Sequence, residues 1–262
     1  MTTEYAFDAI PVGVLWMLMI FGAIGIYEVG FRVGRWWQEH TPDEKEGSTG
    51  LMVGSLLATL GFLLAVTMGM ASGRFDDRRS LVLAEANAIG TTYLRAGYLP
   101  DPQGSEIRNL LRAYVPLRIN VPELAQVQAN NVRSVAIQNE IWTRTQSLAK
   151  AHPDWDVVGL FIGSVNDMID IQNSRAVAGI YSRVPDMVLW ELIGGGALTL
   201  LMVGYNAGLT RKRSLVGAVI LVIVMSAVIT LVVDLDRPRD GFVTVNQQAL
   251  IDLAQQLGPP LP

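Results

Sequence analysis

The sequence predicts an all-α membrane protein, with four transmembrane helices and an all-helical extramembrane domain between the second and third spans. Three observations lead to this prediction. Of the residues, 50% are hydrophobic and only 17% are charged, whereas about 25% of the residues in a soluble domain are charged. Four long apolar runs stand out along the chain. The segment between the second and third runs is polar and has helical periodicity.

Each of the four apolar runs is long enough to cross a bilayer. A hydrocarbon core of about 30 Å requires about 20 helical residues. The runs cover residues 10–31, 50–71, 187–208 and 214–233. The first run is not a cleavable signal, because no basic segment precedes it and "RVGRWWQEH" follows it. The alternative is four buried helices of a soluble protein, which are rarely so long and so free of charge.

The chain is therefore expected to divide into four parts. Residues 1–71 hold the first two spans, and residues 72–186 form the extramembrane domain. Residues 187–233 hold the last two spans, and residues 234–262 form a charged juxtamembrane segment and an amphipathic tail.

Helical periodicity supports this division outside the spans. In the domain, apolar residues that recur on one helical face are Val158, Ile162, Val165, Ile169 and Ala176. In the tail, Leu250, Leu253 and Leu257 predict a short amphipathic helix within residues 244–257. The stretch "PDPQGS" predicts a turn after the helix that continues the second span.

The charges in the loops bear on the orientation in the membrane. With four spans, both termini and the extramembrane domain share one side, and two short loops lie on the other. The basic residues of the short loops are Arg32, Arg35, Lys45, Arg211, Lys212 and Arg213. Basic short loops usually face the cytoplasm, so we assign these loops to the cytoplasm. Arginines also flank the domain side, so the two counts are nearly even.

Acids and arginines gather at the domain-side ends of three spans. The clearest example is "VVDLDRPRDGF", residues 232–242, which follows an apolar run directly. One interpretation is a structural collar of ion pairs, since arginine and carboxylate form bidentate pairs. We assign to this collar Asp76, Arg78, Asp236 and Arg237. The other interpretation is a charged vestibule on an ion pathway. We assign to this vestibule Glu191, Asp234 and Arg74.

Two stripes run side by side along the second span. The small residues of the first stripe are Gly54, Ala58, Gly61, Ala65 and Gly69. Such residues let membrane helices approach closely. The second stripe consists of Ser55, Thr59, Phe62 and Val66. Hydroxyl groups followed by an aromatic and an aliphatic residue suit a pore that narrows to a hydrophobic constriction. The alternative is that both stripes pack against neighbouring helices of the same subunit.

Several classes of function find no support in the residues. There is no cysteine, and His40 and His152 are the only histidines. We find no Ser-His-Asp set, no metal-ligand spacing and no phosphate-binding loop. We therefore expect no enzymatic activity, no metal site and no cofactor. The net charge of −4 gives no reason to expect a nucleic-acid partner.

Two stretches resemble the bestrophin-like domain family of bacterial membrane proteins. They are "FLLAVTMGMASGRFDDRRSLVLAEANAIGTTYLRAGYLP" and "DLDRPRDGFVTVNQQALIDL", which cover residues 62–100 and 234–253. The pattern of the family falls on residues 74–79, 85–91 and 235–238. The resemblance implies a multi-pass protein of the bacterial inner membrane. It also implies kinship with bestrophins, which are pentameric, chiefly chloride-conducting channels lined by their second membrane helix.

Two functional hypotheses follow. The first is a homo-oligomeric ion channel whose pore is lined by the second span, with other copies of the chain, lipid and inorganic ions as its partners. The second is a non-conducting scaffold or sensor that binds a protein partner through its helical domain.

Overall fold

The computed structural model describes residues 7–41, 46–119, 124–211, 213–238 and 241–261. These residues form eight helices and no strand. In chain order the helices are α1 Val12–His40, α2 Glu46–Ala96, α3 Gln103–Arg118, α4 Leu124–Ala151, α5 Asp156–Ile180, α6 Asp186–Thr210, α7 Leu215–Asp236 and α8 Gln248–Leu257. Lys45 and Lys212, which enter the count of loop charges, lie outside the described residues.

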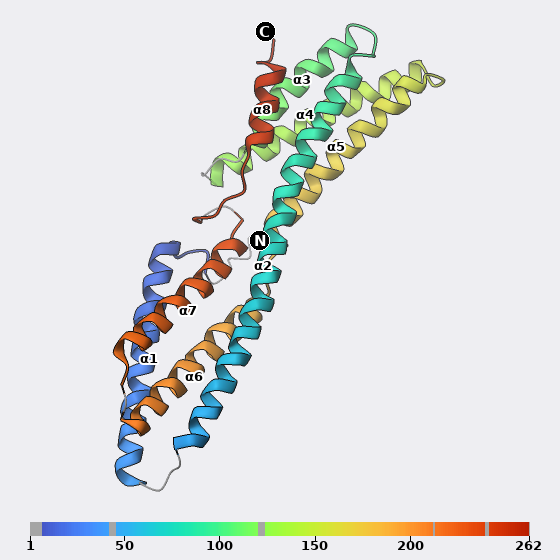
Figure 1. Ribbon diagram of the computed structural model, residues 1–262. Helices are drawn as coiled ribbons and strands as arrows, with labels where there is room; N and C mark the ends of the chain where they lie inside the picture. The colour runs from blue at the N-terminus through green and yellow to red at the C-terminus, as the bar shows by residue number, and fades with distance from the viewer. Residues whose placement is uncertain (1–6, 42–45, 120–123, 212, 239–240, 262) are drawn as a thin grey trace. The chain divides into compact units, whose positions relative to one another are not determined.

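The chain forms two compact units. The membrane unit comprises Met1–Phe75 and Arg183–Thr244, and the helical unit comprises Asp76–Ser182 and Val245–Pro262. The membrane unit contains α1, α6, α7 and the first part of α2, which continues into the helical unit as one helix (Figure 1). Four helices are long and apolar enough to cross a membrane, namely α1, α2, α6 and α7. The predicted all-α membrane fold with four spans is confirmed.

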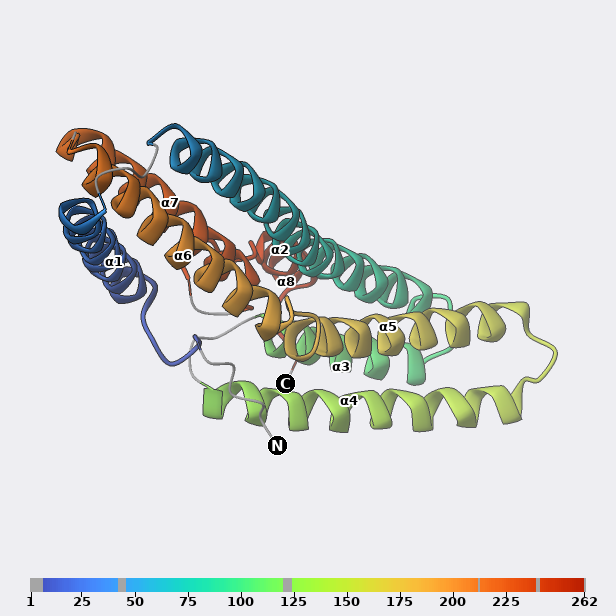
Figure 2. The ribbon, with the colours of Figure 1, turned by 90° about the horizontal axis from the view of Figure 1, so that it is seen from below.

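Close contact between α1 and α6 is made possible by glycines. Both ribbon views show these two helices side by side with α7 (Figures 1 and 2). A methyl group at Gly30 would collide with the carbonyl oxygen of Leu201, and one at Gly34 with that of Tyr205. The opposing glycines on α6 are Gly204 and Gly208, which lie equally close to the α1 backbone. Each helix therefore carries a small-xxx-small motif that allows backbone contact.

The core of the membrane unit lies at the domain-side half of the spans. Its buried apolar residues are Phe7, Leu15, Leu60, Ala71, Val184, Leu189, Leu192, Ile229, Val232 and Val233. The spans differ in how much of their surface this core covers. A third of the most apolar stretch of α6 and of α7 (33% each) is buried within the chain, against only 11% in α2. The second span therefore leaves most of its apolar surface uncovered within one chain.

The helical unit has a core of its own. It is built from the second part of α2 with α3, α4, α5 and α8, and Tyr114, Phe161 and Met168 are fully buried in it. The short helix expected in the tail is α8, and its leucines Leu250 and Leu253 are buried in this core. The amphipathic tail is therefore an integral part of the helical unit.

Candidate functional site

The stripe of Ser55, Thr59, Phe62 and Val66 lies on an exposed face of α2. All four side chains are exposed within the chain, and Phe62 is 68% accessible. The hydroxyl group of Thr59 donates to the backbone carbonyl of Ser55 over 3.0 Å. This bond satisfies the hydroxyl and leaves the face free to meet water, lipid or another chain.

The stripe of small residues beside it is also exposed. No described atom outside the helix backbone lies within 4 Å of a methyl group placed at Gly54, Gly61 or Gly69. Gly30 and Gly34 of α1, by contrast, lie against the backbone of α6. Packing within one subunit, the alternative explanation for both stripes, is therefore not how the described chain uses this face.

The three residues assigned to the vestibule differ in their surroundings. Glu191 is exposed and Arg74 is half-buried. Asp234 is only 2% exposed, and its carboxylate accepts the backbone N–H groups of Phe242 over 2.9 Å and Val243 over 3.0 Å. The carboxylate of Asp234 therefore holds the segment after α7 against the end of that helix.

Asp236 joins the end of α7 to the start of α6. It accepts the backbone N–H of Val184 over 2.7 Å and lies 3.7 Å from the guanidinium group of Arg183. Arg183 in turn donates to both carboxylate oxygens of Asp8 over 2.7 and 2.9 Å. Two acids from distant parts of the chain thus share one buried arginine.

Arg237 binds main-chain oxygens. Its guanidinium group donates to the carbonyl groups of Phe7 and, over 2.8 Å, Ile10. Asp236, the last residue of α7, and Arg237, the next residue, therefore fasten the start of α6 and the N-terminal segment to the end of α7. The two other collar residues belong to the helical unit, where Asp76 is exposed and Arg78 is buried and donates to the carbonyl oxygen of Ser182 over 3.4 Å.

The sequence matches the Bestrophin-like domain over residues 24–250. The chain belongs to the Bestrophin-like family. Its fold is similar to crystal structures of two variants of a bacterial bestrophin homologue from Klebsiella pneumoniae, each with 14% identity and a TM-score of 0.65. Each alignment covers 94% of this chain and 97% of the homologue. A crystal structure described as a membrane protein is also similar, with 14% identity, a TM-score of 0.62 and coverage of 96% and 99%. No curated protein matches.

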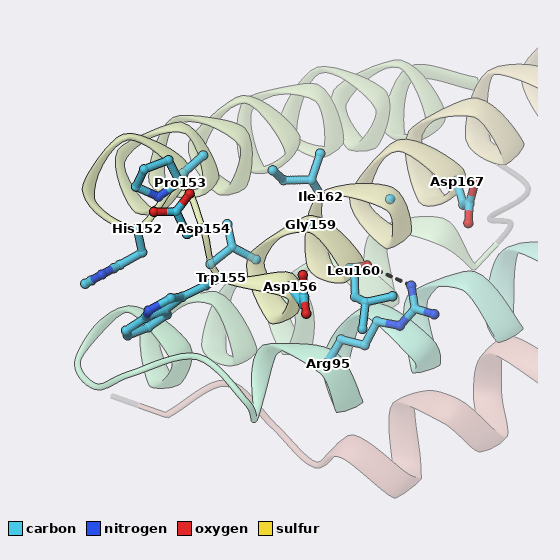
Figure 3. A pocket seen from close by; sticks show the side chains of 13 residues that line it. Arg95, His152, Pro153, Asp154, Trp155, Asp156, Gly159, Leu160, Ile162 and Asp167 are labelled. Atoms are coloured by element: carbon cyan, nitrogen blue, oxygen red, sulfur yellow. Dashed lines mark hydrogen bonds between the residues drawn. The ribbon is translucent and has the colours of Figure 1, made fainter.

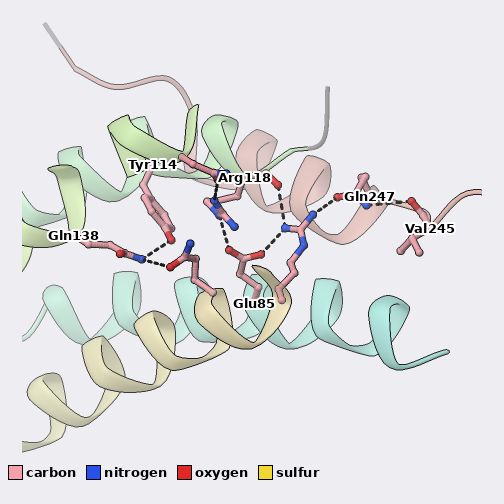
Figure 4. Close-up of polar contacts among 9 residues, drawn as sticks. Glu85, Tyr114, Arg118, Gln138, Val245 and Gln247 are labelled. Atoms are coloured by element: carbon pink, nitrogen blue, oxygen red, sulfur yellow. Dashed lines mark hydrogen bonds and ion pairs between the residues drawn. The ribbon is translucent and has the colours of Figure 1, made fainter. Parts of the chain in front are cut away.

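This bestrophin-like chain also contains a buried ionic network that sequence reasoning missed. Glu85 on α2 is fully buried and pairs with Arg118 of α3 over 2.6 Å and with Arg175 of α5 (Figure 4). Arg175 also donates to the side chain of Gln247, just before α8, over 2.8 Å. The carboxylate thus links three helices, and Arg175 extends the network to the segment before α8. The signal in the sequence was a lone acid among buried apolar positions, between Val82 and Ile89.

A neutral extension of the network surrounds Tyr114. Gln138 of α4 donates to the phenol oxygen of Tyr114 over 2.9 Å and lies 3.4 Å from the amide oxygen of Gln172 on α5 (Figure 4). Burial raises the pKa of Tyr114 to about 12, because the phenolate would lose its hydration. Tyr114 is therefore a neutral structural group at physiological pH.

An open pocket of about 860 Å³ lies at the turn between α4 and α5 (Figure 3). His152 stacks on Trp155, with ring centroids 3.7 Å apart, at one end of the pocket. Arg95 of α2 donates to the carbonyl oxygen of Leu160 over 2.8 Å. Among the described residues no group of three or more His, Cys, Asp or Glu side chains is arranged to hold a metal ion.

Proposed function

We propose that the protein is a homo-oligomeric ion channel whose pore is lined by α2. The observation that carries the proposal is the exposed face of this helix. A membrane span that leaves its hydroxyl groups, Phe62 and Val66 uncovered within its own chain has a face available to line a pore. The bestrophin-like family, whose bestrophin relatives conduct ions, supports this reading.

In this proposal one stripe of α2 makes contacts between subunits and the other lines the pore. The small side chains at Gly54, Ala58 and Gly61 allow the α2 helices of neighbouring copies to approach closely around a common axis. Ser55 and Thr59 then face the water-filled part of the pore, and Phe62 and Val66 form its hydrophobic constriction. Narrow apolar constrictions control conduction by dewetting.

The charged residues at the helix ends complete the proposal. Glu191, which is exposed, and Arg74 border the vestibule. Asp234 braces its wall through the backbone bonds to Phe242 and Val243. The collar residues Asp76, Arg78, Asp236 and Arg237 hold the helix ends in place. We further propose that the protein lies in the bacterial inner membrane with its short loops in the cytoplasm. Its proposed partners are other copies of the chain, lipid and inorganic ions.

Conductance of the purified protein in planar bilayers tests the proposal. Phe62→Ala removes the largest side chain of the constriction, so the single-channel conductance should rise. Phe21→Ala is the matched control, because Phe21 is an equally exposed aromatic residue, 69% accessible, on α1. Its conductance should equal that of the unchanged protein. Bilayers that stay electrically silent across several salts and pH values would contradict the proposal.

A non-conducting scaffold or sensor is the second candidate. It is favoured by exposed apolar side chains outside the membrane spans, such as Val132 and Val135 on α4, which are 71% and 47% accessible. A protein partner that covers these residues should be recovered in stoichiometric amount from native membranes and lost with Val132→Asp. Recovery of the bare homo-oligomer would contradict this second function.

A further inference from the structure

The end of α1 carries two adjacent tryptophans at the depth of lipid headgroups. α1 begins at Val12. About 20 helical residues cross a hydrocarbon core of about 30 Å, so the helix leaves the core near Val33. Trp36 and Trp37 follow within about one turn, and both side chains are exposed. Tryptophan is enriched at this level of membrane proteins, because its ring is apolar and its N–H is polar. The pair therefore marks where α1 meets the interface of the bilayer.

Arginines from two segments gather at this end of the membrane unit. A methyl group at Gly208 would lie 2.7 Å from the backbone nitrogen of Arg35, so the end of α6 touches this turn of α1 (Figure 1). The side chain of Arg35 is 64% exposed and lies 3.6 Å from Glu39. Arg211 directly follows α6, Arg213 lies two residues further on, and both are exposed. The contact between α1 and α6 thus holds arginines from both segments at one level.

The carboxylates beside these arginines leave positive charge unbalanced. Glu28 accepts hydrogen bonds from two arginines, Arg32 over 3.1 Å and Arg213 over 2.6 Å. Within the part of the chain that the structure describes, the side chain of Arg211 has no hydrogen-bond or ion-pair partner. Glu28 and Glu39 thus face four arginines on α1 and the turn between α6 and α7. Basic residues next to a membrane span attract anionic lipids.

An open apolar surface of α1 lies below the tryptophans. At about 100° per residue, Leu18, Gly22, Gly25 and Val29 point within about 40° of the direction of Trp36. All four are exposed within the chain. No described atom outside the helix backbone lies within 4 Å of a methyl group placed at Gly22 or Gly25. An acyl chain can therefore lie along this surface while its headgroup reaches the arginines.

We infer that the end of α1 and the turn between α6 and α7 bind a phospholipid with an anionic headgroup. Arg35 and Arg211 donate to its phosphate, because the planar guanidinium fork matches phosphate oxygens. The tryptophans pack against the lipid between its headgroup and its chains. Lipid surrounds these helices wherever they span a membrane, so the arginines select the charge of the headgroup. All these residues belong to the membrane unit, and the inference holds whether or not the protein conducts ions.

Lipid binding to the full-length protein in detergent, measured by native mass spectrometry, tests the inference. Phosphatidylglycerol and zwitterionic phosphatidylcholine with the same acyl chains are compared. The unchanged protein should bind phosphatidylglycerol several-fold more tightly. Arg35→Gln with Arg211→Gln should lower this preference several-fold, whereas Arg35→Lys with Arg211→Lys should keep most of it, because the charges remain. The matched control is Arg133→Gln with Lys150→Gln, which removes two exposed positive charges from the helical unit and should leave the preference unchanged.

Four results would overturn the inference. Equal affinity of the unchanged protein for the two lipids would do so without any variant. A preference that survives the loss of Arg35 and Arg211 would place the selection elsewhere, and an equal loss in the control would show that only overall charge matters. Displacement of phosphatidylglycerol by an excess of inorganic phosphate would indicate a site for free anions rather than for lipid. None of these results depends on conductance, so the proposed channel is tested separately.

Discussion

The guanidinium group of Arg237 donates to the backbone carbonyl oxygen of Ile10 over 2.8 Å. The bond ties the residue that follows α7 to the segment that precedes α1. The same guanidinium group also binds the carbonyl oxygen of Phe7. A charged side chain next to the most apolar helix therefore serves as a donor to main-chain oxygens of the segment before α1.

Replacement of Arg237 should weaken the membrane unit. In Arg237→Ala the carbonyl groups of Phe7 and Ile10 each lose a charged donor, and a lost hydrogen bond to a charged group costs about 1–3 kcal/mol. We expect a lower melting temperature of the detergent-purified protein. Arg32→Ala is the control, because Arg32 is 78% exposed and pairs with Glu28 on the surface of α1. Equal melting temperatures for the two variants would show that the hydrogen bonds of Arg237 add no more to stability than an exposed ion pair.

The two glycines of α1 that contact α6, Gly30 and Gly34, should tolerate no methyl group. In Gly34→Ala the added Cβ would collide with the carbonyl oxygen of Tyr205, so α1 and α6 must separate. We expect a clear loss of thermal stability. Gly25→Ala, on the same helix but with no described atom within 4 Å of the added Cβ, should melt like the unchanged protein. A stable Gly34→Ala variant would mean that the two helices are not in backbone contact.

Glu85 should be the most sensitive acid of the helical unit. In Glu85→Gln, Arg118 and Arg175 keep their charges in a buried site that no longer contains a carboxylate. Breaking a buried ion pair in this way costs about 3–5 kcal/mol. Urea unfolding followed by the tryptophan fluorescence of the protein measures the loss. The matched variant Glu140→Gln breaks an exposed pair with Arg144 and should cost less than about 0.5 kcal/mol.

Tyr114 should make stability fall at high pH. Its folded-state pKa of about 12 exceeds the value of about 10 in an unfolded chain. Between these values the folded protein keeps a proton that the unfolded chain loses, so the stabilisation is complete below pH about 10 and is lost as pH rises to about 12. From about pH 9 to about pH 11, the free energy of unfolding should fall by about 1 kcal/mol more than in Tyr114→Phe. Equal losses in both proteins would contradict this assignment.

The sequence was sufficient for the class of fold, because apolar runs and helical periodicity are local signals. The four spans and the tail helix with Leu250 follow from such signals. The acid at Glu85 was not recognised as buried, since its two arginine partners, Arg118 and Arg175, lie 33 and 90 positions away. Long-range pairing of this kind leaves no periodic trace in one sequence.

The partners of the charged residues at the helix ends could also be predicted only in part from the sequence. Counting charges predicted that acids and arginines meet beside the membrane, and Asp236 does lie near an arginine, Arg183. The count could not foresee that Arg237 and Asp234 bind backbone groups instead, because main-chain donors and acceptors carry no residue identity.

The most direct test of the central claim uses the absence of cysteine from the sequence. A single cysteine placed by Thr59→Cys or Val66→Cys is then the only thiol that a charged, membrane-impermeant methanethiosulfonate reagent can modify. If α2 lines the pore, the reagent should reduce the current of both variants and leave Phe21→Cys, on the exposed face of α1, unaffected. Currents that persist unchanged in Thr59→Cys and Val66→Cys after complete labelling would contradict a pore lined by α2.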